Sequence, residues 1–167
     1  LITGEREYSS LFGVTAHELA HSWFHHLLGT NEAKYAWMDE GFTSFYDMLC
    51  EAAILGTENP YSSFYDRYFQ LVQSGVEEPL TTHADRFQYN FAYGVGSYSK
   101  GALFLAQLEY IMGTYKLIET IKRYYDVFKF SHPTPNDFKR IAEKVSGMQL
   151  EWYLNDWVRT TNTIDYG

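Results

Sequence analysis

Apolar side chains recur every three or four residues along most of this chain, which is the period of an amphipathic helix. The pattern predicts about seven helices and no strand beyond the first few residues. The predicted helices cover residues 11–28, 37–55, 60–74, 98–112, 115–128, 135–146 and 150–158. Most of them end at a glycine, which readily takes the left-handed conformation of a helix C-terminus. We therefore expect an all-α fold with a single domain over residues 1–167.

The connections between these helices differ in length and character. Residues 30–35 are polar and predict a short loop, whereas residues 75–96 contain few periodic positions and predict a long ordered loop. Loops of that length often line a binding site. The segment from Ala102 to Leu108 is apolar on nearly all sides, so we expect it to form the central, buried helix.

Several helix starts are marked by residues that cap a helix N-terminus. Ser9 or Ser10 is expected to cap the first helix, and Ser97 the helix that follows the long loop. Thr134 followed by Pro135 is a strong start signal, because proline suits the first helical position.

The amino-acid composition excludes or disfavours several classes of protein and partner. The chain is 46% hydrophobic and 19% aromatic, which excludes a disordered protein. Its net charge of −8 disfavours nucleic acid and anionic membrane surfaces as partners, and no apolar run is long enough to span a membrane. Cys50 is the only cysteine, so no internal disulfide forms, and its apolar surroundings predict a buried side chain.

The most informative chemical motif is H-E-x-x-H, formed by His17, Glu18 and His21. Residues four apart lie on one face of a helix, so the two histidines can hold one metal ion between them. Glu18 is rotated by about 100° from His17 and can reach water bound to that ion. The alternative is that both histidines pack in the core without binding a metal.

A catalytic zinc ion needs a third protein ligand. The pattern with a close third histidine requires Gly at position 24 and His at position 27, where this chain has Phe24 and Leu27. A carboxylate is available instead, because Glu40 follows His21 after 18 intervening residues, at the start of the next predicted helix. Two antiparallel helices joined by a short loop would bring Glu40 beside the histidine pair.

These residues resemble the gluzincin aminopeptidases of the aminopeptidase N family. That family has H-E-x-x-H, an 18-residue gap and then W-x-x-E-G-F, which matches the segment from Trp37 to Phe42. Trp23-Phe24 fits the W-F pair after the second histidine, and the segment from Tyr98 to Gly101 fits a Y-x-K-G block. The resemblance covers nearly the whole chain and implies the α-helical lobe of a thermolysin-like zincin catalytic domain.

The resemblance also implies roles for single residues. His17, His21 and Glu40 would bind one Zn²⁺ per chain, and Glu18 would be the general base that passes a proton from the attacking water to the leaving amine. Tyr98 would donate a hydrogen bond to the developing oxyanion. Tyr93 is the alternative candidate for that tyrosine.

The chain departs from the family pattern at several positions. His25 and His26 stand where the family usually has Gly-Asn, and Asp39 replaces an Asn before the ligand glutamate. The family's G-x-M-E-N strand, which binds the free amine of the substrate, is not present. We therefore expect a fragment of a larger metallopeptidase, whose β-rich N-terminal lobe would be this chain's partner.

The resulting hypothesis is zinc-dependent removal of N-terminal residues from peptides. The first alternative is another gluzincin hydrolase, such as an endopeptidase or an epoxide hydrolase, which would not need the amine-binding segment. The second is a helical module that binds zinc without turnover, although Glu18 would then have no purpose. The sequence leaves the cellular compartment and the substrate side-chain preference open.

Overall fold

The computed structural model describes residues 5–162 of the chain, and their side chains from residue 11 onward. Within that range it contains seven helices of nine or more residues and no named strand, which confirms the predicted all-α fold. The seven are α1 (Glu5–Ala20), α3 (Phe42–Leu55), α4 (Ser62–Ser74), α6 (Gly101–Met112), α7 (Thr114–Phe128), α8 (Pro135–Ser146) and α9 (Glu151–Arg159). The shorter elements are α2 (Glu32–Ala36), α5 (Asn90–Gly94), the 3₁₀ turn η2 (Ala84–Arg86) and two π-helical segments, η1 (Trp37–Gly41) and η3 (Val95–Lys100).

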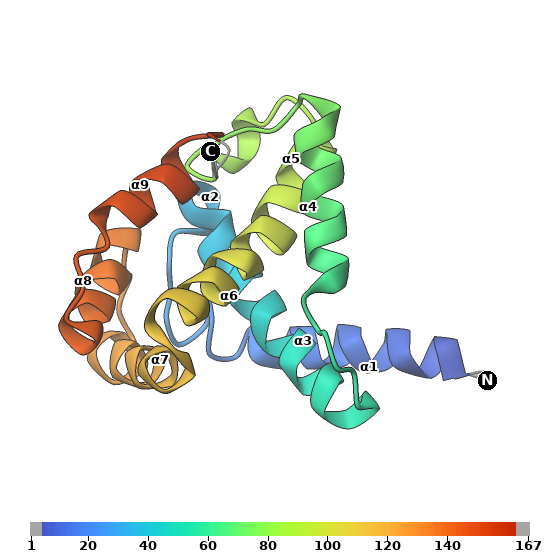
Figure 1. The fold of residues 1–167 in the computed structure, drawn as a ribbon, viewed down its shortest axis with the longest axis horizontal. Coiled ribbons are helices and arrows are strands. Elements are labelled where there is room, and N and C mark those ends of the chain that lie inside the picture. Colours follow the sequence, from blue (N-terminus) through green and yellow to red (C-terminus); the bar gives the residue numbers. More distant parts are fainter. Residues whose placement is uncertain (1–4, 163–167) are drawn as a thin grey trace.

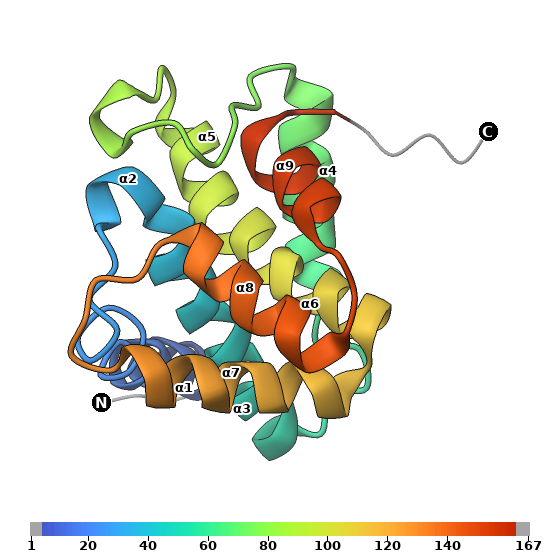
Figure 2. The ribbon, with the colours of Figure 1, turned by 90° about the vertical axis from the view of Figure 1, so that its left-hand side faces the viewer.

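Helix α6 runs through the middle of the molecule, with α4 on one side and α7, α8 and α9 on the other (Figures 1 and 2). Ala102, Leu103, Phe104, Leu105 and Leu108 of this helix are each at most 2% exposed, as the apolar run from Ala102 to Leu108 predicts. In the described part of the chain, no helix combines the length and the apolar character needed to cross a membrane.

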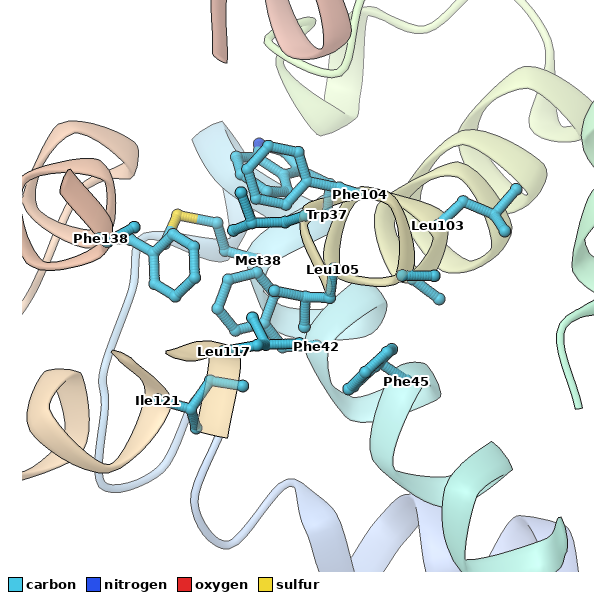
Figure 3. Close-up of a cluster of buried hydrophobic side chains, with 14 of the residues drawn as sticks. Trp37, Met38, Phe42, Phe45, Leu103, Phe104, Leu105, Leu117, Ile121 and Phe138 are labelled. Carbon is cyan, nitrogen blue, oxygen red and sulfur yellow. The ribbon is translucent and has the colours of Figure 1, made fainter. Parts of the chain in front are cut away.

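Aromatic rings form the centre of the core around α6 (Figure 3). Trp37 lies edge-on to Phe104, with ring centroids 4.9 Å apart, and Phe42 lies edge-on to Phe138 at 5.0 Å. Edge-to-face contacts of this kind add about 0.5–1.5 kcal/mol to the hydrophobic gain from burial. The rings come from η1, α3, α6 and α8, so the core ties the segment around residue 40 to the central helix.

Two backbones approach each other very closely in this core, at Gly41 and Gly101. A Cβ atom added to Gly41 would lie 2.6 Å from the Cα of Gly101, and one added to Gly101 would lie 2.9 Å from the Cα of Gly41. Only glycine allows the end of η1 to lie directly against the start of α6. The contact fixes the positions of the residues that precede each glycine, Glu40 on η1 and Lys100 on η3.

The first predicted helix differs most from the structure. It begins at Glu5, so neither Ser9 nor Ser10 caps it, and it ends at Ala20 rather than Leu28. Residues 21–28 form turns, in which Leu28 pairs with Ser131. Phe24 and Leu28 are buried and have the spacing of a helix face, but the loop buries them equally well. The apolar pattern therefore could not distinguish a helix from a loop here.

Three other boundaries also differ from the prediction. Residues 30–35 include most of helix α2, and the predicted 75–96 loop contains η2, α5 and the start of η3. Ser97 lies inside η3 and caps no helix. These polar segments form short helices although most of their residues are exposed or half-buried, because a helical turn pairs their backbone N–H and C=O groups locally.

The helix ends predicted from glycine after α3, α4 and α8, and the helix start predicted from proline in α8, are confirmed. Gly56, Gly75 and Gly147 each follow a helix with a positive φ, in the left-handed region. Thr134 and Asp137 form a capping box at the start of α8. Cys50, in contrast, is exposed, so the prediction that it is buried is wrong: the apolar stripe of α3 packs inward without it.

Replacing Gly41 by Ala is expected to lower the free energy of unfolding by about 1–3 kcal/mol, because the new Cβ meets the backbone of Gly101 rather than a flexible side chain. Chemical denaturation measures the change. Gly94→Ala is the matched control, since Gly94 is helical and no atom lies within 4 Å of its added Cβ. Equal losses of stability in the two variants would contradict the close contact.

Candidate metal centre

The two histidines of the motif lie at the end of α1. His17 is in the last turn of the helix, and His21 is the first residue beyond it. The backbone N–H of His21 still donates to the carbonyl of His17, at 3.2 Å, so the helical path continues as far as the second histidine. The ring centroids are 4.8 Å apart and nearly perpendicular, which leaves one nitrogen of each ring free to face a common point.

Glu40 occupies that common point. Its Oε2 atom lies 3.1 Å from Nε2 of His17 and 3.4 Å from Nε2 of His21. One ligand atom from each of the three residues lies within 4.8 Å of the others. The structure therefore brings together His17, His21 and Glu40 as predicted, although Glu40 belongs to a π-helical segment rather than to a regular helix.

The other nitrogen of each histidine ring is held by neighbouring side chains. Nδ1 of His17 is 2.6 Å from Oδ2 of Asp47. Nδ1 of His21 is 3.2 Å from the carbonyl oxygen of Phe24 and from Oγ1 of Thr43, and the Asp39 carboxylate lies 3.0 Å away without a hydrogen bond. Acceptors at Nδ1 keep the proton on that side and leave Nε2 as the ligand atom, which is the usual arrangement around a metal-binding histidine.

Sequence reasoning missed Asp47 and Thr43. Both lie on α3, where they follow Glu40 by seven and three residues, on the face of the helix that turns toward α1. The sequence carried no local signal for Asp47, because it lies off the apolar stripe of the helix, where an acidic residue is ordinary, and its partner His17 is 30 residues away.

Tyr98 adds a fourth predicted residue to the centre. Its ring stacks on that of His17, with centroids 5.6 Å apart and an interplanar angle of 15°. Its hydroxyl also makes a hydrogen bond to Glu40. Tyr98 belongs to η3, so the contact between Gly41 and Gly101 is what brings the tyrosine to the metal-binding residues. Both π-helical segments thus carry a candidate site residue, a placement common for π-helical turns.

Glu18 and Lys100 lie apart from this contact network. Burial raises the pKa of the Tyr93 phenol, and the charges of Glu40 and Asp39 raise it further, so Tyr93 lies near the network. The side chain of Glu18 is exposed and makes no hydrogen bond or ion pair with the side chains described from residue 11 to residue 162. The ring of Tyr93 lies edge-on to Phe87, at 5.5 Å. The buried ammonium of Lys100 is 2.7 Å from a carboxylate oxygen of Glu77, which agrees with a structural role for this lysine.

The electrostatics of the centre favour a bound cation. Burial lowers the pKa of His17, but hydrogen bonds to Asp47 and Glu40 outweigh burial and raise it to about 9. Burial acts to raise the pKa of Glu40, and its contacts with His17 and Tyr98 overcome this and lower it. Three carboxylates, Asp39, Glu40 and Asp47, therefore surround two imidazoles, and this excess of negative charge attracts a positive ion.

The donor set fits zinc. Two imidazole nitrogens and one carboxylate oxygen are the ligands of a common class of catalytic zinc site, which keeps its fourth position open. Each histidine has the outer acceptor that such a ligand requires, and the three side chains are only partly buried, so an ion can reach them.

Comparison with known proteins gives a consistent result. The model of the Peptidase family M1 domain matches residues 2–157. A probable aminopeptidase 2 of Sulfurisphaera tokodaii is 28% identical over 153 residues, which is 87% of this chain and 19% of that protein. The glutamyl aminopeptidase of Sus scrofa is 26% identical over 164 residues, 92% of this chain and 16% of that protein. The chain therefore spans less than a fifth of the length of either relative.

Solved structures share the fold. The M1 zinc metallopeptidase of Deinococcus radiodurans aligns with a TM-score of 0.75 and 23% identity, over 92% of this chain and 34% of that one. A mutant of that metallopeptidase bound to a Tyr-Ser-Ala substrate aligns with a TM-score of 0.73 and covers 90% of this chain.

Replacing Asp47 by Asn is expected to weaken zinc binding by about 10- to 100-fold, because Nδ1 of His17 loses its charged acceptor. Competition with a chromophoric chelator measures the zinc affinity. Asp66→Asn, at an exposed position on α4, removes the same charge far from the histidines and serves as control. Equal zinc affinity in the two variants would show that Asp47 does not support the ligand.

Proposed function

Because the chain belongs to peptidase family M1, we propose that it carries the metal centre of a zinc aminopeptidase that removes N-terminal residues from peptides. One observation carries the proposal: Nε2 of His17 and Nε2 of His21 both face the same oxygen of Glu40. The names of the relatives, aminopeptidases from an archaeon and a mammal, support the reaction class.

His17, His21 and Glu40 would hold one zinc ion per chain. When bound, zinc supplies a Lewis acid that polarises the scissile carbonyl and acidifies water. The protein contributes the orientation of the ligands, through Asp47 behind His17 and through Asp39 and Thr43 behind His21. This outer layer holds the rings in place before the ion arrives, so little reorganisation is needed on binding.

Glu18 is the proposed general base. It is the neighbour of His17 on α1, and its exposure with no partner in the described structure leaves the carboxylate able to accept a proton. Glu18 would take a proton from the attacking water and deliver it to the amine that leaves. A carboxylate already committed to an ion pair would be a weaker base for this task.

Tyr98 is the proposed donor to the oxyanion. A phenol remains protonated at neutral pH and can donate one hydrogen bond. Stacking on His17 keeps the Tyr98 ring next to the ligands, and the hydroxyl that contacts Glu40 could turn to the substrate oxygen. A hydrogen-bond donor held in position in this way typically raises kcat by a factor of about 10²–10³.

Glu18→Gln is expected to lower kcat by about 10²–10⁴ while zinc stoichiometry and thermal stability stay unchanged, because the amide keeps the shape but accepts no proton. Hydrolysis of an unblocked aminoacyl anilide by the zinc-loaded protein measures the rate. Glu119→Gln on α7 is the control. Loss of zinc or of folding in Glu18→Gln would instead favour a structural, non-enzymatic zinc module.

Tyr98→Phe is expected to lower kcat by about 10²–10³ with a smaller change in KM, since the hydroxyl would act mainly in the transition state. The phenyl ring preserves the stacking on His17, so zinc affinity should change much less than kcat. If Tyr93→Phe lowered kcat more than Tyr98→Phe, the oxyanion donor would be Tyr93.

The substrate class is tested by blocking the amine. An aminopeptidase should cleave a free peptide and leave its N-acetylated form intact, because the amine is part of what is recognised. Mass spectrometry measures the cleavage of both peptides. Equal cleavage of the two would identify an endopeptidase on the same zinc centre.

A further inference from the structure

A second group of potential metal ligands lies next to the first. His25, Glu32 and Asp39 each offer one ligand atom, and these atoms lie within 4.8 Å of one another. Nε2 of His25 is 3.1 Å from Oε2 of Glu32, and Nδ1 of His25 is 3.8 Å from Oδ2 of Asp39. None of the three belongs to the proposed zinc-binding set, and they come from the turns after α1, from α2 and from η1.

The backbone of His25 is strained in the conformation that makes this group. Its φ is +108°, a region that residues with a Cβ rarely adopt. Such a conformation costs of order 1–3 kcal/mol and persists where surrounding contacts require it. Glycine would avoid this cost, whereas histidine brings an imidazole that faces Glu32 and Asp39.

The polar atoms of the group are incompletely satisfied by the protein. Nδ1 of His25 is buried and has no hydrogen-bond partner in the described structure. The separation of 3.8 Å from Asp39 is too long for a hydrogen bond. Two ligands of one zinc ion, at about 2.0–2.2 Å from it, lie roughly 3–4 Å apart, so an ion between Nδ1 of His25 and Oδ2 of Asp39 fits their separation. Glu32 now faces Nε2, the other nitrogen of the ring, and its exposed side chain would turn to reach the same ion.

Asp39 connects the two groups because its carboxylate oxygens face in different directions. Oδ1 lies 3.0 Å from Nδ1 of His21, whereas Oδ2 lies on the side of His25. The side chain is only 8% exposed, and an unpaired carboxylate at that depth is costly. One oxygen can therefore support the ligand His21 while the other binds a cation directly.

The ligand types define the class of ion. An imidazole with two carboxylates suits zinc and neighbouring transition metals, whereas Mg²⁺ and Ca²⁺ prefer oxygen ligands alone. Solvent can deliver the ion, because Glu32 is 65% exposed and His25 borders an open cavity of about 650 Å³ that His26 and His132 also line.

We propose that His25, Glu32 and Asp39 form a second site for a divalent transition-metal ion of the zinc type, next to the proposed catalytic centre and joined to it by the Asp39 carboxylate. The second ion lies behind His21, on the side away from Glu40. The two centres are occupied separately, and the first does not need the second for its own three ligands.

The test is a titration of the metal-free protein with Zn²⁺ against a chromophoric chelator. Wild-type protein is expected to bind two equivalents. His25→Gly and Glu32→Gln are each expected to bind one, and both variants should fold, since glycine suits the backbone at position 25 and Glu32 is exposed. His26→Ala is the matched control: it removes an exposed neighbouring histidine outside the group and should retain two equivalents.

Glu40→Gln separates this proposal from the catalytic one. It is expected to lose the first ion and retain the second. A single equivalent in wild-type protein, lost in Glu40→Gln and kept in His25→Gly, would overturn the second site and leave the proposed function intact. Two equivalents in both His25→Gly and Glu32→Gln would also overturn it, because the second ion would then bind elsewhere.

Asp39→Asn tests the link between the centres. The amide keeps the shape of the side chain but has no charge for a cation. The variant is expected to lose the second ion and to bind the first about tenfold more weakly. Retention of both ions at wild-type affinity would contradict the role given to Asp39.

Discussion

The direct contact between the backbones of Gly41 and Gly101 is the constraint on which the candidate centre depends. The two glycines set how closely the end of η1 and the start of α6 approach each other. Glu40 precedes the first glycine, and Tyr98 lies three residues before the second. Because side chains at either position would push η1 and α6 apart, the contact decides whether the glutamate and the tyrosine reach His17 together. The aromatic core around Trp37 and Phe104 holds the two segments in that arrangement.

Carboxylates organise the space around the two histidines. Asp47 supports His17, Asp39 supports His21, and Glu40 faces both. Burial raises the pKa of Asp39 to about 6, although His25 lowers it, so the fold carries a real electrostatic cost at this position. Such a concentration of negative charge is stable only when cations neutralise it. The imidazolium form of His17 does so in the metal-free chain, and one or two metal ions would do so more completely.

Most of the helices and the main site residues could be predicted from the sequence. The apolar run of α6, the glycines after α3, α4 and α8, and the Thr134–Pro135 start each express a local preference that tertiary contacts did not override. His17, His21 and Glu40 could be chosen because zinc requires particular ligand types and the motif spacing matches them. The end of α1 could not be predicted, since Phe24 and Leu28 are buried with the same spacing in a helix or in a loop. Asp47 was missed because its partner, His17, is 30 residues away in the chain.

The sequence by itself determined the all-α fold, the helical face that carries the two histidines and the identity of the third metal-binding candidate. These are consequences of periodicity, backbone preference and ligand chemistry, which act over a few residues. Only the tertiary structure decided that Tyr98 stacks on His17 and that His25 takes a positive φ. It also decided that one carboxylate oxygen of Asp39 faces His21 and the other faces His25. Those outcomes depend on how distant segments approach one another, and that distance is set by packing around Gly41 and Gly101 rather than by any local preference.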